Sequence, residues 1–460
     1  QIDQSLSGFT ELQENGKYAL QGAGVIVDNK TNYVVAIVGG RSTEDKFNRA
    51  YLSARQPGST IKPLIDYGPA FDTGEYYPTR MVDDHKWTDG PSNSGGRYFG
   101  NVTVREALNR SLNTVAWQIL EDIGIDYGLD YLGEMQFQKL TYVDNNVPSL
   151  SIGGFTNGVR VVDMAKGYST LANGGVYNDR TCIIKIEHEH DGELTKDLKP
   201  SAHQVYRDDS AFMLTDVLKG TFTAAYGTGQ GLGLDNDMPA AGKTGTTNSS
   251  KDTWFCGYTR YYTTAIWVGY DIPRNMPGIY GATYAGRIWK SVMDQIHEGL
   301  EPWDWIQPET VERKVDPKTG MEDYFSTTAQ FRAEQSLHEK EQEQLETTLQ
   351  ASVDAFMEKE IGSVEDTYTV KDEYNSITSK LPLLDDGELR ASLLEKVESR
   401  YNYFKEIIAG MSDEISRYEA VQAEEKKQAQ EQAAKDAEAK RAQEEKAVKK
   451  QTFMQALERI

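Results

Sequence analysis

The chain has 460 residues and a formal net charge of −22, and 38% of its residues are hydrophobic. This length predicts two or three domains rather than one. The acidic balance, with no basic stripe, argues against a nucleic-acid partner.

The first residues predict a connector followed by a β-hairpin. No apolar run approaches the ~20 residues of a membrane span, there is no signal peptide, and the first residue is Gln1. We therefore expect a soluble portion of a longer, membrane-anchored protein, with residues 1–21 as its connector. The β-rich runs 24–27 and 33–38, joined by a polar turn, predict a hairpin.

A candidate nucleophile follows at Ser59-Thr60-Ile61-Lys62, directly after Gln56-Pro57-Gly58. Serine and lysine three apart on a helix share one face, and a neutral lysine amine can take the serine proton. Proline and glycine predict a loop, so Ser59 is expected at a helix N-terminus, where developing negative charge is favoured.

Helical patterns dominate the middle of the first half, over 104–119, 161–171 and 210–218. The sequence Ser111-Leu112-Asn113 lies within the first of these. Lys243-Thr244-Gly245-Thr246 then precedes strand-like runs at 254–258 and 263–270, and 288–296 predicts a closing helix. Strands at both ends of the domain with helices between them predict an α+β fold: a mainly antiparallel five-stranded sheet covered by helices, with an inserted helical lobe.

The three motifs occur in the order that marks penicillin-binding proteins and class A β-lactamases. The flanking segments 47–50, 55–59, 172–175, 227–229, 252–258 and 265–270 are also similar to that group. Over residues 22–302 the chain resembles the transpeptidase domain of a class A (bifunctional) penicillin-binding protein. The resemblance implies the penicillin-recognising serine transferase/β-lactamase-like fold.

The resemblance also implies a role for each motif residue. Ser59 is the nucleophile and Lys62 the base, which Lys243 would help to keep neutral. Ser111 passes the proton to the leaving nitrogen, and Asn113 orients Lys62. The terminal carboxylate of the substrate is bound by Lys243, Thr244, Gly245 and Thr246. The backbone N–H groups of Ser59 and Thr246 would form the oxyanion hole.

The implied activity is D,D-transpeptidation of peptidoglycan stem peptides through a Ser59 acyl-enzyme, on the extracytoplasmic face of a bacterial membrane, without metal or organic cofactor. β-Lactams would acylate the same serine. Two alternatives stay open: hydrolysis of that acyl-enzyme by a D,D-carboxypeptidase or β-lactamase, and a non-catalytic scaffold or sensor.

Smaller features receive plainer interpretations. Lys318-Thr319-Gly320 follows Asp-Pro and predicts a turn within a linker over 303–327. His188-Glu189-His190 could bind zinc, but a solvated hairpin arm is favoured. Cys182 and Cys256 lie in strand-like runs and are expected to be buried thiols, although a disulfide between them stays open.

The C-terminal part changes character. Apolar residues recur at helical spacing over 345–357 and 389–418, separated by Pro382, and 385–388 predicts a helix cap. We expect an α-helical appendage: a helical hairpin or small bundle over 328–420, and a charged helical or disordered tail over 421–460. This region is a candidate binding site for a protein partner.

Overall fold

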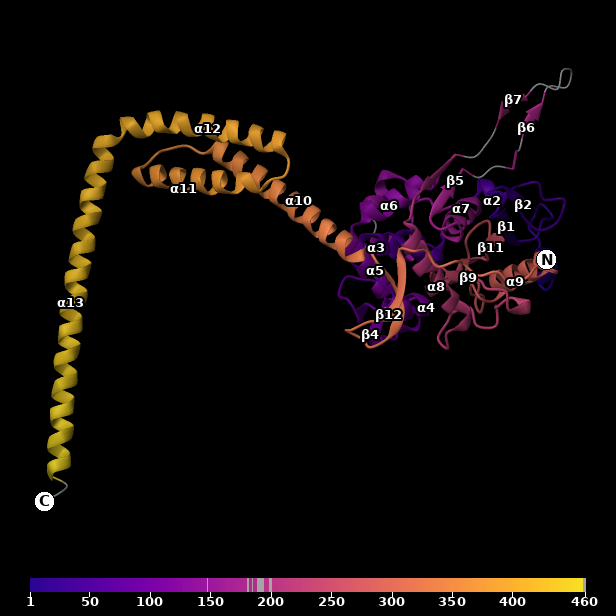
Figure 1. Cartoon of the computed structure of the whole chain (residues 1–460), viewed down its shortest axis with the longest axis horizontal. Coiled ribbons are helices and arrows are strands. Elements are labelled where there is room, and N and C mark those ends of the chain that lie inside the picture. Colours follow the sequence, from indigo (N-terminus) through magenta and orange to yellow (C-terminus); the bar gives the residue numbers. More distant parts are fainter. Residues whose placement is uncertain (147, 180–181, 184, 188–193, 198–200, 458–460) are drawn as a thin grey trace. The chain divides into compact units, whose positions relative to one another are not determined.

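The computed structural model describes residues 1–146, 148–179, 182–183, 185–187, 194–197 and 201–457. The chain divides into two compact units, Gln1–Ser336 and Leu337–Ile460 (Figure 1). The pair His188 and His190 lies outside the described residues.

A five-stranded antiparallel sheet forms the centre of the first unit. Its order is β2-β1-β11-β10-β9. Strands from the two ends of the unit meet where β1 pairs with β11, which confirms the predicted α+β fold. The strands are β1 (Leu20–Asp28), β2 (Val34–Val38), β9 (Ala241–Thr246), β10 (Asp252–Tyr258) and β11 (Tyr262–Tyr270).

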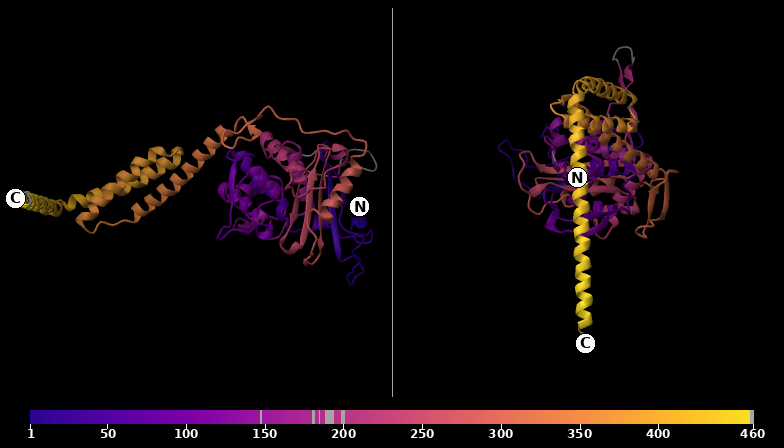
Figure 2. Two further views of the ribbon diagram at one scale, coloured as in Figure 1. Left: turned by 90° about the horizontal axis from the view of Figure 1, so that it is seen from below. Right: turned by 90° about the vertical axis from the view of Figure 1, so that its left-hand side faces the viewer.

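Alternating side chains of the sheet point to opposite faces and belong to two separate hydrophobic cores. On β10, Trp254, Cys256 and Tyr258 belong to one core, whereas Phe255 belongs to the other. Helix α7 (Val161–Ala172) packs on the first face and α9 (Tyr284–Ile296) on the second. Figure 2 shows the sheet between these helical layers. Every residue of β10 is buried, because helices cover both faces of the sheet, and its apolar run 254–256 therefore does not alternate with polar residues.

The inserted lobe is helical, as expected, but the predicted helix over 104–119 is broken. It forms two helices, and Ser111 between them has a left-handed backbone with φ 62°. The lobe contains α3 (Gly68–Thr73), α4 (Val104–Arg110), α5 (Asn113–Ile123), α6 (Ile125–Glu134) and α8 (Asp208–Thr223), with the short strands β3 (Met81–Asp84) and β4 (Gly100–Thr103).

Small elements complete the first unit. Most of them are single turns or short paired strands. They are α1 (Ile2–Ser5), α2 (Arg49–Leu52), β5 (Val176–Asn178), β6 (Lys185–Glu187), β7 (Leu194–Asp197), β8 (Ala202–Gln204) and the 3₁₀ turns Ser94–Gly96, Tyr142–Asn146, Pro148–Ile152, Asp235–Asp237 and Asn248–Ser250.

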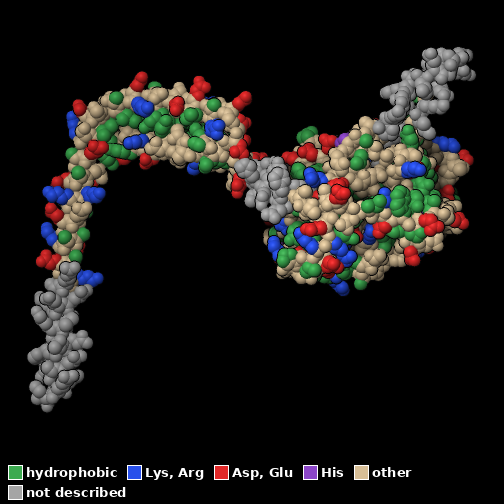
Figure 3. All heavy atoms as spheres, viewed as in Figure 1, with side chains coloured by type: hydrophobic (Ala, Val, Ile, Leu, Met, Phe, Trp, Pro, Cys, Tyr) green, Lys and Arg blue, Asp and Glu red, His purple; other side chains and the backbone are tan. Residues whose placement is uncertain are grey.

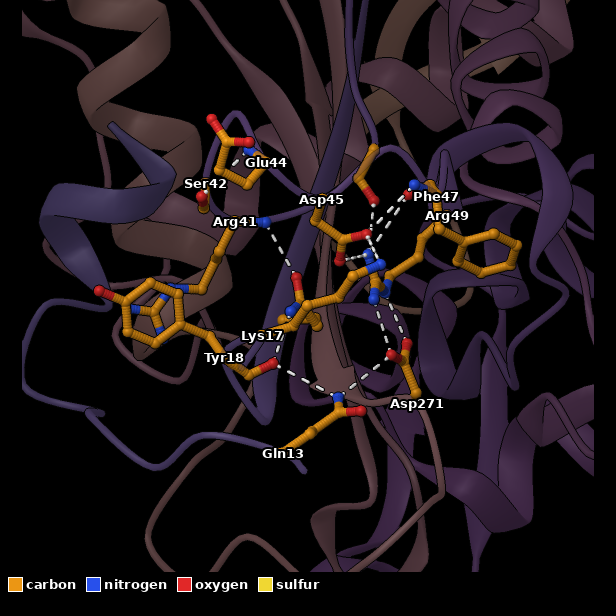
Figure 4. A network of polar contacts seen from close by, with 12 residues as sticks. Gln13, Lys17, Tyr18, Arg41, Ser42, Glu44, Asp45, Phe47, Arg49 and Asp271 are labelled. Atoms are coloured by element: carbon orange, nitrogen blue, oxygen red, sulfur yellow. Dashed lines mark hydrogen bonds and ion pairs between the residues drawn. The ribbon is translucent and has the colours of Figure 1, made fainter. Parts of the chain in front are cut away.

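The N-terminal residues pack on the domain. Ile2 and Leu6 are buried in the same core as α9, because their apolar side chains cover the open face of the sheet. A buried charge network also ties this segment down (Figure 4). Arg49 forms ion pairs with Asp45 and Asp271, and Asp45 also accepts from Lys17.

Residues 303–327 were expected to be a linker, and this expectation is wrong in its second half. Strands β12 (Val311–Val315) and β13 (Glu322–Ser326) form an antiparallel hairpin, with the turn Lys318-Thr319-Gly320 at its tip. The hairpin is fixed to the domain because Arg105 pairs with Asp323 and Thr79 donates to Asp316 at 2.6 Å. Polar anchors of this kind leave little apolar pattern in the sequence.

The second unit is a helical bundle with its own core. Its helices are the part of α10 (Ala329–Glu358) from Leu337 onward, α11 (Val364–Lys380), α12 (Gly387–Gly410) and α13 (Ser412–Leu457), with a 3₁₀ turn at Leu381–Leu383. Apolar side chains from α10, α11 and α12 pack together, and Figure 3 shows them along the seam of the bundle. The helix α11 was not predicted, because only Val370 and Ile377 are buried apolar residues on it. Asp386 caps α12, as expected.

Two further observations concern the cysteines and the membrane. Cys182 is exposed and Cys256 is buried, and both are free thiols, so the expected burial holds only for Cys256. Within the described ranges, no helix is long and apolar enough to cross a lipid bilayer.

Candidate active site

Ser59 lies on a tight turn that presses against the sheet edge. The turn Gly58–Thr60 is 3₁₀-helical rather than the start of an α-helix, and it contacts β9 and β10. Gly58 has φ +54°, and a Cβ there would approach the backbone carbonyl oxygen of Thr246 to 3.0 Å. Glycine is therefore required at this position by both conformation and space.

Gly245 provides the matching space on β9. A Cβ at Gly245 would lie 2.6 Å from the carbonyl oxygen of Pro57. The glycine of the Lys-Thr-Gly motif thus lets the Ser59 turn approach the strand backbone, a packing role that its expected part in substrate binding does not include.

The residues just before Ser59 are clamped from several directions. Trp254 Nε1 donates to the carbonyl oxygen of Gln56 at 2.8 Å, and the Gln56 side chain exchanges two hydrogen bonds with the backbone of Phe155. Arg55 pairs with Asp252 at 2.7 Å and donates to the carbonyl oxygen of Tyr270. These contacts hold the turn independently of any substrate.

Lys62 is fully buried one turn after Ser59, at the start of a π-helical turn, Pro63–Tyr67. Its Nζ donates to Asn113 Oδ1 at 2.7 Å, and to the carbonyl oxygens of Ser111 at 2.8 Å and Leu112 at 3.1 Å. Burial lowers the pKa of Lys62 to about 7, an effect that the carboxyl of Asp66 opposes. A substantial share of this amine is therefore neutral near neutral pH.

Ser111 lies between two lysine amines. Lys243 Nζ donates to Ser111 Oγ at 2.8 Å, while Lys62 holds the carbonyl oxygen of the same residue. Burial, followed by the nearby Lys62, lowers the pKa of Lys243 well below its usual value. The left-handed backbone of Ser111 makes this possible, because it ends α4 and turns the residue toward both lysines.

The remaining motif residues line the same strand edge. Thr244 Oγ1 donates to Thr228 Oγ1 at 2.8 Å, and Thr246 Oγ1 accepts from the backbone N–H of Gly281 at 3.0 Å. The structure thus gathers Lys62, Ser111, Asn113 and Lys243 into one hydrogen-bonded group, with Ser59 and Thr244–Thr246 beside it. A nucleophile, a neutral base, a hydroxyl relay and cationic groups are the parts that serine acyl transfer needs.

Comparison with known proteins places this arrangement in a family. Residues 22–294 match the model of the penicillin binding protein transpeptidase domain. The chain belongs to this family. Its fold and the order of its three motifs are those of a penicillin-binding transpeptidase domain.

Curated relatives agree with this assignment. Penicillin-binding protein 1A of Clostridium botulinum (strain Hall) is 32% identical over 65% of this chain and 37% of its own length. Penicillin-binding protein 4 of Bacillus subtilis is 32% identical over 64% of this chain and 47% of its own. The chain therefore spans less than half the length of these relatives.

Solved structures support the fold alone. Penicillin-binding protein 1A of Haemophilus influenzae superposes with a TM-score of 0.59 at 24% identity, over 69% of this chain and 56% of that one. PonA1 of Mycobacterium tuberculosis, solved with penicillin V, gives 0.57 at 24% identity, over 70% of this chain and 87% of that one.

Several residues of the transpeptidase site were not singled out from the sequence. Thr228 was noted only as part of a turn, yet it pairs with Thr244. Asp66 is fully buried near Lys62, and neither of its carboxyl oxygens has a hydrogen-bond partner among the described residues. Asn93, twenty positions before Asn113 in the chain, accepts a hydrogen bond from its backbone N–H. The one signal in the sequence that could have drawn attention to Asp66 is an aspartate among apolar residues, four positions after Lys62.

Proposed function

We propose that this domain is a serine D,D-transpeptidase that cross-links peptidoglycan stem peptides. The observation that carries the proposal is the group around Ser111, whose carbonyl oxygen binds Lys62 and whose hydroxyl binds Lys243. It places Ser111, whose hydroxyl can relay a proton, beside a buried base with a lowered pKa. The family match and the names of the relatives support the same function.

In acylation, neutral Lys62 takes the proton of Ser59, and Ser59 Oγ attacks the carbonyl carbon of the D-alanyl-D-alanine bond. The backbone N–H groups of Ser59 and Thr246 stabilise the oxyanion. Ser111 transfers a proton to the leaving D-alanine nitrogen, and Lys62 reprotonates Ser111. Lys243, Thr244 and Thr246 hold the terminal carboxylate, and the amine of a neighbouring stem peptide then releases the acyl group as a new amide.

β-Lactams would acylate Ser59 through the same contacts, because their ring amide and carboxylate resemble those of the donor peptide. The proposed setting is the extracytoplasmic face of a bacterial membrane, in a longer membrane-anchored protein. The helical unit beyond residue 336 is a candidate site for a protein partner.

The first test is intact-protein mass spectrometry after incubation with benzylpenicillin, on wild type and Ser59→Ala. We expect a persistent adduct with wild type alone. An adduct that disappears within seconds would indicate a β-lactamase, and no adduct would favour the scaffold alternative.

A second assay separates transfer from hydrolysis. The protein is given a peptide ending in D-alanyl-D-alanine together with an amine acceptor, and the products are resolved by mass. The exchanged peptide is expected to form with wild type and not with Ser59→Ala. A shortened peptide without exchange would instead identify a D,D-carboxypeptidase.

A further inference from the structure

Helix α5, which carries Asn113, is capped by a side chain from a distant loop. A helix start leaves backbone N–H groups without partners, and Leu112 at the N-cap position offers no side-chain acceptor. Asn93 Oδ1 supplies it, accepting from the N–H of Asn113 at 2.7 Å and of Thr114 at 3.3 Å. Asn93 belongs to the connection between β3 and β4.

Asp84 at the end of β3 fixes this cap. Asn93 Nδ2 donates to Asp84 Oδ1 at 2.6 Å, and the Thr114 hydroxyl donates to the same oxygen. The other oxygen accepts from the N–H of Phe99 at 2.8 Å. Asp84, Asn93 and Thr114 are 1%, 6% and 0% exposed. Each donor of this buried group has its acceptor, so its geometry is defined.

The same loop sets the orientation of the Asn113 side chain. Asn113 Nδ2 donates to the carbonyl oxygen of Ser92 at 2.9 Å, which directs Oδ1 toward Lys62 Nζ at 2.7 Å. The neighbouring Asn93 thus holds the backbone of Asn113, while Ser92 holds its amide. A displaced loop would release both contacts together.

We propose that Asp84 and Asn93 are positioning residues for acylation: they hold Asn113, and through it Lys62, in the geometry that proton removal from Ser59 needs. This inference rests on the proposed function. The pair touches neither Ser59 nor Lys62 directly, and it acts through the start of α5 and the 85–99 loop.

The test exchanges the two side chains. Asn93→Asp places two carboxylates at hydrogen-bond distance, and Asp84→Asn removes the carboxylate that accepts from both Asn93 and Thr114. The double variant Asp84→Asn/Asn93→Asp restores an amide–carboxylate pair with the donor reversed, and the carboxylate introduced at position 93 can still cap α5. We expect the acylation rate constant at saturating benzylpenicillin to fall roughly tenfold or more in each single variant and to recover to within about threefold of wild type in the double variant.

The pH profile separates positioning from simple stabilisation. A hydrogen bond accepted by Asn113 Oδ1 favours the charged form of Lys62, so losing it should move the acid limb of acylation to lower pH in Asp84→Asn, whereas in Asn93→Asp the added carboxylate opposes this shift. The other charged or titratable groups near Lys62 are Asp66 on its own helical turn and Lys243 on β9, and neither is altered.

Asn29→Asp is the matched control. Asn29 is also 6% exposed, and it bonds Thr259 and Thr263 outside the site. This variant should lose thermal stability and keep the wild-type rate constant and pH limb. Single exchange variants that behave like this control would overturn the inference, as would a double variant that regains stability without regaining rate. A wild-type protein that is not acylated would remove the proposed function, and this inference with it.

Discussion

At the residue scale, the site depends on two lysines that are both fully buried. Burial disfavours a charged ammonium, and two ammonium groups around one serine disfavour each other further. Ser111 is the residue that both lysines contact, and its left-handed backbone is uncommon for a residue with a side chain. Such local strain is typical of functional positions.

The acid limb of acylation should report Lys62. Its pKa is lowered to about 7, so the neutral base is scarce below that pH and dominant above it. Between pH 6 and 8 the rate of benzylpenicillin acylation should rise about tenfold. Stopped-flow acylation across this range measures it, and a flat profile would exclude Lys62 as the titrating base.

Ser111→Gly should distinguish the role of the Ser111 hydroxyl from that of its backbone conformation. Glycine accepts φ 62° without strain, so the break between α4 and α5 is expected to persist. Removing the hydroxyl takes away the acceptor of Lys243 and the proton relay, and acylation should fall by about 10²–10⁴. The measurement is the acylation rate beside the melting temperature. A normal rate would show that the hydroxyl is dispensable.

At the element scale, the site forms where the Ser59 turn meets the edge strand β9. Glycine makes this contact possible, since a Cβ at Gly58 or Gly245 would lie only 3.0 or 2.6 Å from a backbone carbonyl oxygen of the opposite element. Arg55 and Trp254 then fix the turn to β10 and β11. The sheet thus acts as a rigid support for the nucleophile.

Gly245→Ala should push the Ser59 turn away from β9. The new Cβ would clash with Pro57 and Thr60. This clash should lower the free energy of unfolding by about 1–3 kcal/mol and displace Ser59. Gly133→Ala is the control, because a Cβ there meets no atom within 4 Å. We expect acylation to fall at least tenfold only in the first variant. Equal rates in both would mean that the contact does not position Ser59.

At the scale of the whole molecule, the chain contains two units with separate cores. The β12–β13 hairpin belongs to the first unit, although it lies beyond the residues that match the family. It is anchored by polar contacts, since Asp323 pairs with Arg105 and Ser326 donates to Asp209 at 2.5 Å, and by Tyr324, which packs against Phe212.

Truncation at two points tests this division. A chain ending at Ser336 keeps the hairpin and should retain wild-type acylation and nearly the same melting temperature. A chain ending at Gly320 loses β13 and leaves Arg105 without Asp323, which should cost at least about 2 kcal/mol of stability. Thermal melts and penicillin acylation measure both. Loss of acylation in the chain that ends at Ser336 would show that the helical unit is part of the catalytic machinery.

The sequence by itself determined the sheet, the helical lobe and the order of the motifs, because alternation, helical periodicity and short motifs are local properties of the chain. It also predicted the cap of α12. Only the tertiary structure decided which distant residues meet: Asn93 with Asn113, Thr228 with Thr244, and Asp323 with Arg105. These polar contacts join residues far apart in sequence and leave no periodic pattern. For the same reason, the docked hairpin looked like a linker and the break at Ser111 looked like continuous helix.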